Sequence, residues 1–388
     1  MDYHKIMNKL MKNYIISITI LIFVFICISN AETNLEIDGE VSVFANYGPD
    51  NYINTQFAGR YLPEILYSID LGQGSILDFD LSANLNGSLS MHPFDTAFTE
   101  GEIEPYRLWA RYYGNQYEIR LGLQKIDFGT ATLLRPLQWF NQVDPRDPLK
   151  ITNGVYGLLG RYYFLNNANV WAWVLYGNEK RRGLDAVESN KELPEFGARV
   201  QYPTPLGEIA LSYHHRTANA NNLLGSKDFE KIPEDRIGID GKWDVGVGLW
   251  FEAVYIHKSK EIGMFTNQSL FNIGTDYTFD IGNGLNVLFE HLILTYDKTA
   301  FKFAYNNNIS ASSISYPLGL NDNISSIFSY DWNSNEIMAF LNFQHQFDNF
   351  MGYIMAYYNP KSTNNIQENV TVNDFTGPGI QIMIVYNH

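Results

Sequence analysis

Residues 77–89 read LDFDLSANLNGSL, and this stretch decides the fold class. Leu77, Phe79 and Leu81 alternate with polar residues, and the alternation continues to Leu89. Because successive side chains of a β-strand point to opposite faces, this pattern predicts a strand with one apolar and one polar face. The stretch is longer than the five or so residues that are common in soluble sheets.

The same alternation recurs through the chain, at 34–47, 106–112, 117–124 and 380–386, whereas long stretches with helical periodicity are missing. Starting from 34–47, about 18 strands can be laid out, the last at about 376–387. The strand near 309–318 has a weak pattern and the one near 168–177 is apolar on both faces, so 16 strands are also possible. The number should be even, because a closed antiparallel bacterial barrel brings both chain ends to one side.

The connections between these strands alternate between very short turns and long polar loops. The turns lie near residues 72–74, 114–115, 166–167, 203–205, 244–246, 282–284, 319–321 and 348–349. The loops lie near residues 92–103, 127–152, 178–194, 218–233, 298–308 and 360–374. Short periplasmic turns facing long external loops are typical of bacterial outer-membrane barrels.

A membrane explains both the long strands and the composition. Inside a bilayer every backbone N–H and C=O needs a protein partner, and a closed barrel provides one for each. The chain has 26 Tyr, 25 Phe and only 18% charged residues, which suits a surface that faces lipid and its interfaces. We therefore expect an all-β transmembrane antiparallel barrel with short periplasmic turns and long external loops. The alternative is a soluble secreted sandwich or propeller.

The N-terminus indicates export. Lys5, Lys9 and Lys12 precede an apolar run at 15–29, and small residues at Ser29 and Ala31 suit cleavage after Ala31. We expect residues 1–31 to be a signal peptide and residues 32–388 to be a single barrel domain in the outer membrane of a Gram-negative bacterium. Cys27, the one cysteine, would leave with the peptide. The alternative is an uncleaved anchor helix.

Composition and motifs exclude several classes of function. The remaining chain would carry a net charge of −17, which does not suit a nucleic-acid partner. No metalloprotease, nucleophile-elbow or phosphate-loop motif occurs, so we expect no enzyme and no cofactor. His214 and His215 are adjacent and would point to opposite faces of a strand, so we expect no metal site there.

If the apolar face of each strand meets lipid, the polar face lines the lumen. The first and third strands then place acidic residues in the pore, and the fourth to eighth strands place basic ones. Two arrangements are open: the rows face each other across the pore and create a transverse field, or they pair between neighbouring strands and stabilise the wall. The predicted pore-lining residues are Glu36, Asp38, Glu40, Asp78 and Asp80 (acidic) and Arg107, Arg111, Arg120, Arg161 and Arg199 (basic).

The long loop at 127–152 is apolar as well as polar. Residues 133–140 read LLRPLQWF, and a charged segment follows. An apolar aromatic loop in water would be costly, so we expect it to fold into the barrel and narrow the pore; packing on the rim is the alternative. The candidate constriction residues are Arg135, Trp139, Phe140, Asp144, Arg146 and Asp147.

Residues 120–129 (RLGLQKIDFG), then Asp144-Pro145-Arg146-Asp147 and Gly154-Val155-Tyr156, resemble a recurrent segment of large porin-like outer-membrane barrels. Alginate-export-type channels and related barrels have similar runs. The resemblance covers about 40 residues well and implies a barrel rather than a particular substrate. Many such proteins end in Phe or Trp, read by the barrel assembly machinery, whereas here the last aromatic is Tyr386, two residues from the end.

We therefore expect a porin-like channel for passive diffusion of small polar or charged solutes, without cofactor or metal. Its expected partners are outer-membrane lipid, lipopolysaccharide, the barrel assembly machinery and the solutes, and the sequence leaves the oligomeric state open. Two alternatives remain: an export channel for an anionic surface polysaccharide, and a closed barrel that acts as an enzyme or adhesin.

Overall fold

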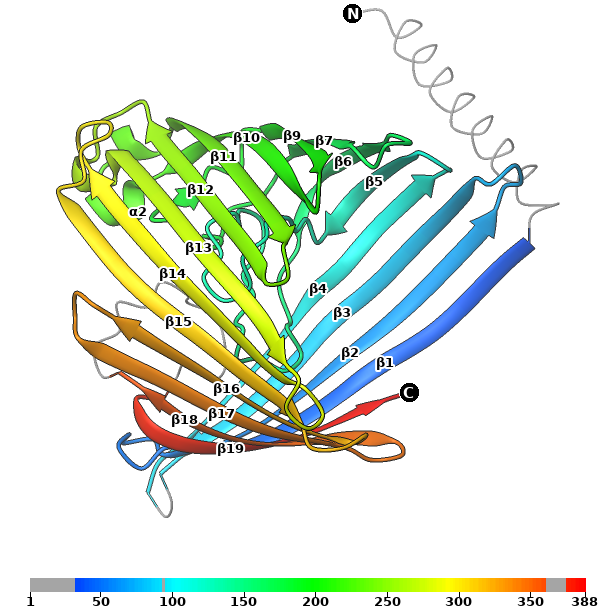
Figure 1. Ribbon diagram of the computed structural model, residues 1–388, viewed down its shortest axis with the longest axis vertical. Coiled ribbons are helices and arrows are strands. Elements are labelled where there is room, and N and C mark those ends of the chain that lie inside the picture. Colours follow the sequence, from blue (N-terminus) through cyan, green and yellow to red (C-terminus); the bar gives the residue numbers. More distant parts are fainter. Residues whose placement is uncertain (1–31, 93–94, 361–374) are drawn as a thin grey trace, which may run out of the picture.

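The computed structural model describes residues 32–92, 95–360 and 375–388, and these form a closed antiparallel barrel of 18 strands with one short extra strand (Figure 1). Sequential strands pair with each other, and β1 pairs with β19 to close the sheet. The extra strand, β8, pairs with the end of β10, and β7 pairs directly with β9. The all-β barrel and its 18 strands were predicted from the sequence, and both are confirmed.

The strands are β1 (Glu32–Tyr47), β2 (Thr55–Asp70), β3 (Ile76–Met91), β4 (Ala97–Tyr113), β5 (Tyr117–Gln124), β6 (Val155–Tyr163), β7 (Asn169–Leu175), β8 (Glu188–Ser189), β9 (Glu195–Thr204), β10 (Gly207–Asn219), β11 (Ile232–Asp244), β12 (Gly248–Lys258), β13 (Asn267–Phe279), β14 (Leu285–Asp297), β15 (Tyr305–Pro317), β16 (Asp322–Asp331), β17 (Glu336–Gln346), β18 (Phe350–Asn359) and β19 (Gly377–Asn387). Three single-turn helices, α2 (Asn221–Leu224), η1 (Lys227–Phe229) and η2 (Gly263–Thr266), lie in the connections. Among the described residues, no helix is long and apolar enough to cross a membrane. The predicted signal peptide lies outside the described residues.

The alternation of side chains sorts the two faces of the barrel wall. On β19, Ile380, Ile382 and Ile384 are about half exposed on the outside, whereas Gln381 and Val385 are buried inside. An outer face of exposed aliphatic and aromatic residues is what a lipid-facing surface requires. The alternation with a period of two therefore forms the strands and also gives the wall one face toward lipid and one toward the lumen.

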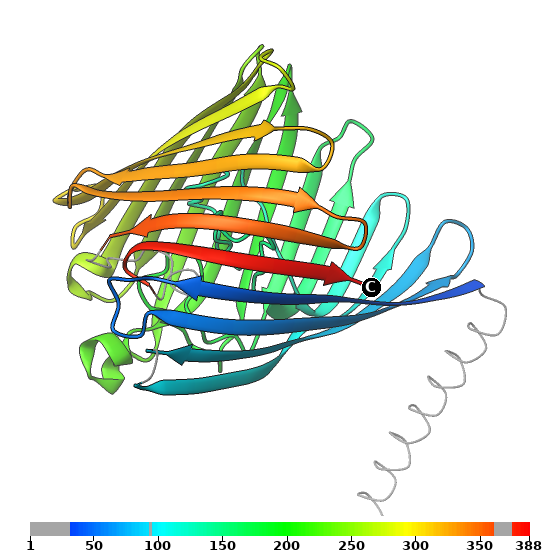
Figure 2. The same ribbon diagram turned by 90° about the horizontal axis from the view of Figure 1, so that it is seen from below.

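Long and short connections lie at opposite ends of the barrel, as predicted, but one loop is much shorter than expected (Figure 2). Residues 92–103 were predicted to be a loop, and this is wrong: β4 already begins at Ala97.

A bulge between Ser82 and Ala83 shifts the β3–β4 register, with Ala83 opposite Pro105 and Ser82 opposite Arg107. A proline in a strand commonly marks such an irregularity.

The wall from β1 to β4 is built from strands of 16 or 17 residues, longer than those in the rest of the barrel. At the turn end, β1 runs well past the C-terminal end of β19 (Figure 1). This part of the sheet therefore projects beyond its neighbours.

Candidate functional site in the lumen

The connection between β5 and β6, residues 125–154, lies inside the barrel and is fixed to the far wall. Two inward-facing carboxylates hold its backbone. The first, Glu252 on β12, accepts hydrogen bonds from the N–H groups of Thr130 (2.6 Å), Ala131 (2.7 Å) and Leu137 (3.0 Å). Each such bond to a charged acceptor contributes roughly 1.5–3 kcal/mol. The loop is thus anchored in a defined position.

Glu290 on β14 does the same for the next three residues of this loop. It accepts from the N–H groups of Thr132 (2.6 Å), Leu133 (3.0 Å) and Leu134 (2.6 Å), and from the indole of Trp250 (3.1 Å). Six backbone donors that would otherwise be unsatisfied inside the barrel therefore have partners.

The apolar part of the loop forms a core inside the barrel. Phe128 and Phe140 pack on Trp173 with ring centroids 5.7 and 5.3 Å apart, and Leu137 approaches Gly238 on β11. A side chain at Gly238 would come within 2.5 Å of Leu137, so glycine is required for the close approach. The inward residues that complete the core are Leu159, Leu175, Val254, Ile256, Leu270, Leu292 and Leu294.

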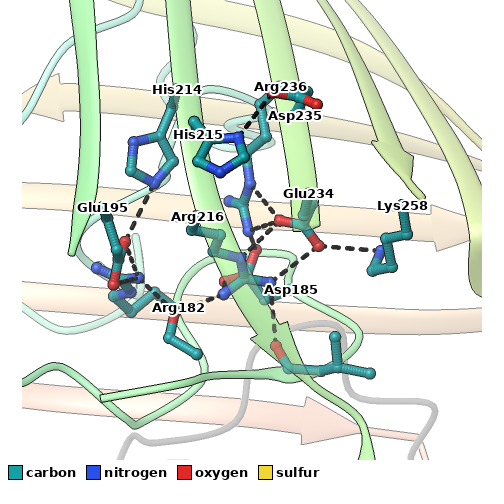
Figure 3. A network of polar contacts seen from close by, with 12 residues as sticks. Arg182, Asp185, Glu195, His214, His215, Arg216, Glu234, Asp235, Arg236 and Lys258 are labelled. Carbon is teal, nitrogen blue, oxygen red and sulfur yellow. Dashed lines mark hydrogen bonds and ion pairs between the residues drawn. The ribbon is translucent and has the colours of Figure 1, made fainter. Parts of the chain in front are cut away.

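The connection between β7 and β9 also enters the barrel, where a buried network of charges holds it (Figure 3). Asp185 of this connection pairs with Arg216 on β10 (2.8 Å) and Arg236 on β11 (2.7 Å), and both arginines also pair with Glu234. Lys258 on β12 completes the cluster, 3.1 Å from Glu234. The buried acidic and basic side chains of these strands are therefore paired with one another and not with water.

A second part of the same network joins Arg182 to the wall. Its guanidinium pairs with Glu195 at 2.7 Å, and Glu195 is 3.1 Å from the ring of His214. The other ring nitrogen of His214 accepts from the indole of Trp173. The charged network therefore continues directly into the aromatic core of the loop at 125–154.

The two inward loops fill the lumen beside β6 to β13, and open space remains beside β2, β3 and β4. A cavity of about 990 Å³ is lined mainly by the inward residues of these strands and by residues 180–188, and its far side reaches Leu294 and Tyr296 of β14 and Asn307 of β15. A second cavity of about 440 Å³ continues between this wall and the loop at 125–154. The residues that line both cavities are Arg60, Glu104, Gln142, Asn153, Lys180 and Arg181.

Acidic residues of β4 line the larger cavity in a row: Glu100, Glu102 and Glu104. Glu104 pairs with Lys180 at 2.7 Å, whereas Glu100 and Glu102 are exposed and form no ion pair with any described residue. The sequence reasoning missed this row, because it treated 92–103 as a loop. The alternating Glu100, Glu102 and Glu104 before Pro105 were the available signal.

Asp147 of the loop lies at the smaller cavity together with Arg60. Burial raises the pKa of the Asp147 carboxyl, although the backbone amides of Leu149 and Ile151 and the charge of Arg60 act to lower it. On acidification this carboxyl therefore loses its negative charge at a higher pH than an ordinary aspartate does.

The five predicted basic pore-lining residues lie on the inner face, and four of them pair with three carboxylates. Arg111 pairs with Asp78, and Arg199 pairs with Asp240 at 2.6 Å. Arg120 and Arg161 both lie against Glu118, at 2.8 and 3.7 Å. The fifth, Arg107, donates to the carbonyl of Thr152 in the long loop. Most of these arginines therefore pair with carboxylates of the wall and do not form an isolated basic row.

The predicted acidic residues separate into two groups. Asp78 and Asp80 on β3 are buried inside the barrel, and Glu40 on β1 is half-buried. Glu36 and Asp38 are exposed near the turn end of β1, away from the two cavities.

Most of the other predicted residues of this loop bond or pack against the protein and not against the open cavities. Arg135 pairs with Asp127 at 2.5 Å, and Trp139 and Phe140 lie in the inner core. Asp144 and Arg146 form a buried pair, and Arg146 also donates to Asn359 on β18. Of the six predicted constriction residues, Phe140 and Asp147 line the smaller cavity, and Asp147 is the charged one of the two.

The adjacent histidines point to opposite faces, as expected from their strand position. His214 is buried inside, whereas His215 bonds Asp235 on the outside. Within the described ranges no group of three or more His, Cys, Asp or Glu residues could hold a metal ion.

Solved structures with the same architecture are outer-membrane barrels. The chain resembles OccAB1 of Acinetobacter baumannii (TM-score 0.56, 10% identity, 93% of this chain and 99% of that one). It also resembles OccAB2 of the same organism (0.55, 11%, 92% and 98%) and OccK5 of Pseudomonas aeruginosa (0.54, 10%, 91% and 98%). At such identities the likeness concerns the fold. No profile of a known protein family matches the sequence, and no curated protein does.

Proposed function

We propose that the protein is an outer-membrane channel through which small polar or charged solutes diffuse passively. The observation that carries this proposal is the cavity of about 990 Å³ inside a closed barrel, lined by charged and polar residues of β2 to β4. The similar Occ structures are outer-membrane porins, which supports the same function and a location in the Gram-negative outer membrane. No energy source or cofactor is needed for such transport.

The loop at 125–154 acts in this proposal as a fixed constriction. Its backbone is bound to Glu252 and Glu290, and its Gln142, Asp147 and Asn153 face the passage. Solutes then pass between these residues and Arg60 on β2, so the loop and the wall together set the width.

We further propose that the entrance favours cations. Glu100 and Glu102 contribute negative charge at the larger cavity, while most of the predicted arginine row is paired with carboxylates. In a narrow aqueous space with low-dielectric walls, such unpaired charges raise the local concentration of counter-ions.

Export of an anionic polysaccharide is the alternative that the sequence resemblance to alginate-export-type channels suggests. It would require a basic passage that is free to bind the polymer. Arg111, Arg120 and Arg199 are instead occupied by Asp78, Glu118 and Asp240. Diffusion of small solutes is therefore the function that we favour.

Single-channel recording tests the proposal. The chain without residues 1–31, refolded and inserted in planar bilayers, should give steady open steps in KCl. A correctly folded, inserted barrel that conducts nothing would contradict the channel and favour a closed barrel with activity in its loops.

A further inference from the structure

One edge of the barrel sheet has no partner strand among the described residues. The pairing of β1 with β19 begins at Glu40, opposite Asn387, and Gly39 exchanges two backbone hydrogen bonds with His388. On its other side β1 pairs with β2 along its whole length, from Glu32 opposite Asp70. Residues 32–38 therefore form a strand that is paired on one edge and open on the other.

The open edge presents a regular set of backbone groups. Gly39 uses its N–H and C=O to bond His388 on the β19 side. Because these groups alternate between the two edges of a strand, those of Thr33, Leu35 and Ile37 also point to the open side. Three donors and three acceptors are thus available, spaced as in any antiparallel ladder.

An edge of this kind requires either cover or protection. In lipid, unpaired backbone groups would each cost several kcal/mol, and in water a long edge is a template for another chain. The outward residues Leu35 and Ile37 are 58% and 66% exposed, so the edge is also apolar. Proline and bulges, which blunt many edges, do not occur in residues 32–38.

The inner face of the same edge is acidic. Glu36 and Asp38 are exposed there, and Asp38 lies directly opposite Glu64 on β2. Neither Glu36 nor Asp38 forms an ion pair with a described residue. Directly opposite on β2 lie Leu66 and Glu64, so Glu36 and Asp38 have no basic residue across from them in that strand.

We propose that the open edge at 32–38 binds an extended segment of a periplasmic partner by strand addition, and that this segment alternates apolar and basic residues. Its backbone would pair with Thr33, Leu35 and Ile37, which is the usual source of affinity in strand addition. Its apolar residues would continue the outer face, and its basic residues would lie beside Glu36 and Asp38.

A second copy of this chain does not fit the same edge. Two antiparallel copies paired through Leu35 and Ile37 would place Glu36 and Asp38 of both chains next to each other. Like charges in neighbouring positions across a strand pair are destabilising. The charge of the edge therefore favours a basic partner over self-association. This inference does not depend on whether the barrel conducts.

Peptide binding to the barrel in lipid nanodiscs tests the proposal. The probe is a fluorescent, end-blocked peptide of alternating lysine and valine, and its control alternates glutamate and valine. We expect the basic peptide to bind and the acidic one not to bind. Equal binding of both, or binding of neither, would overturn the proposal.

The decisive variant is Ile37→Pro, with Ile37→Val as its matched control. Proline removes an N–H that points to the open edge and leaves the pairing with β2 intact. We expect it to weaken binding of the basic peptide about tenfold, the loss of one or two backbone hydrogen bonds, whereas the valine variant binds normally.

Two readouts distinguish peptide binding at the open edge from binding in the lumen and from self-association. Conductance and heat stability of Ile37→Pro should equal those of the parent barrel, because the edge lies outside the lumen. Unchanged peptide binding in Ile37→Pro would mean that lysines bind the acidic lumen instead. A dimer in analytical ultracentrifugation that this substitution dissolves would assign the edge to a second copy, which also overturns the proposal.

Discussion

At the scale of single residues, selectivity depends on which charges lack a partner rather than on how many charges the lumen holds. Arg199 and Asp240 are both buried and bond each other, so together they present little field to a passing ion. Glu100 and Glu102 are exposed at the cavity and have no such partner among the described residues. A few side chains on β4 should therefore dominate ion preference.

The double substitution Glu100→Gln and Glu102→Gln should shift selectivity toward anions. We expect the ratio of K⁺ to Cl⁻ permeability to fall about two- to threefold in 0.1 M salt and much less in 1 M salt, where the screening length is about 3 Å. Reversal potentials across a KCl gradient measure this ratio. Arg60→Gln removes a positive charge from the same cavity and should raise the ratio. If neither variant changes the ratio, these charges do not set the ion preference of the channel.

At the scale of elements, the loop at 125–154 is both the inner core of the barrel and the boundary of its passage. Its contacts reach β12, β14 and β18, strands far from it in sequence. The loop is therefore expected to behave as a rigid part of the wall and not as a mobile lid.

Replacing residues 131–147 with a short Gly-Ser linker should widen the passage. We expect single-channel conductance to rise about twofold or more, because the narrowest cross-section limits the current. Unchanged conductance in a folded, inserted deletion variant would show that the loop does not form the constriction.

Glu290→Gln tests the same loop without a deletion. One oxygen of Glu290 accepts from Thr132 and Trp250 and the other from Leu133 and Leu134, so the N–H₂ group of the amide would face two donors. Docking of the loop should therefore weaken by roughly 1–3 kcal/mol. We expect a lower unfolding midpoint and noisier open-channel current. Glu208→Gln on β10 is the control and should behave as the parent does, because the Glu208 side chain bonds Gln201 on the neighbouring strand and not the loop.

At the scale of the whole molecule, the barrel could be predicted from the sequence because period-two alternation is a local property. The sequence also indicated that part of the lumen is filled, because the strand near 168–177 is apolar on both faces. In the structure, Trp171 and Trp173 of this strand point inward and pack on Phe128. The partners of these side chains were not predictable, since alternation gives the face of a residue and not its contact across the lumen. Thus Asp78 and Arg111 were assigned to the acidic and the basic row with pairing between strands left open, and only the structure shows that these two pair.

The β3–β4 bulge explains the missed acidic row. It changes the face of every residue beyond it, so the alternation seen at 106–112 does not extend to Glu104, and the predicted loop at 92–103 took Glu100 and Glu102 out of the predicted lumen. The boundary of the long loop at 127–152 was close to the observed 125–154, because Gln124 and Val155 end two well-patterned strands.

Solutes should pass beside β2 to β4, because the two inward loops fill the lumen beside β6 to β13. Without residues 1–31 the chain has no cysteine, so single cysteines can be probed with a cationic thiol reagent during bilayer recording. Ser88→Cys at the cavity and Ser212→Cys in the filled half are a matched pair on the inner face. We expect the reagent to reduce the current of Ser88→Cys and to leave that of Ser212→Cys unchanged. Block at Ser212→Cys with no effect at Ser88→Cys would contradict this expectation.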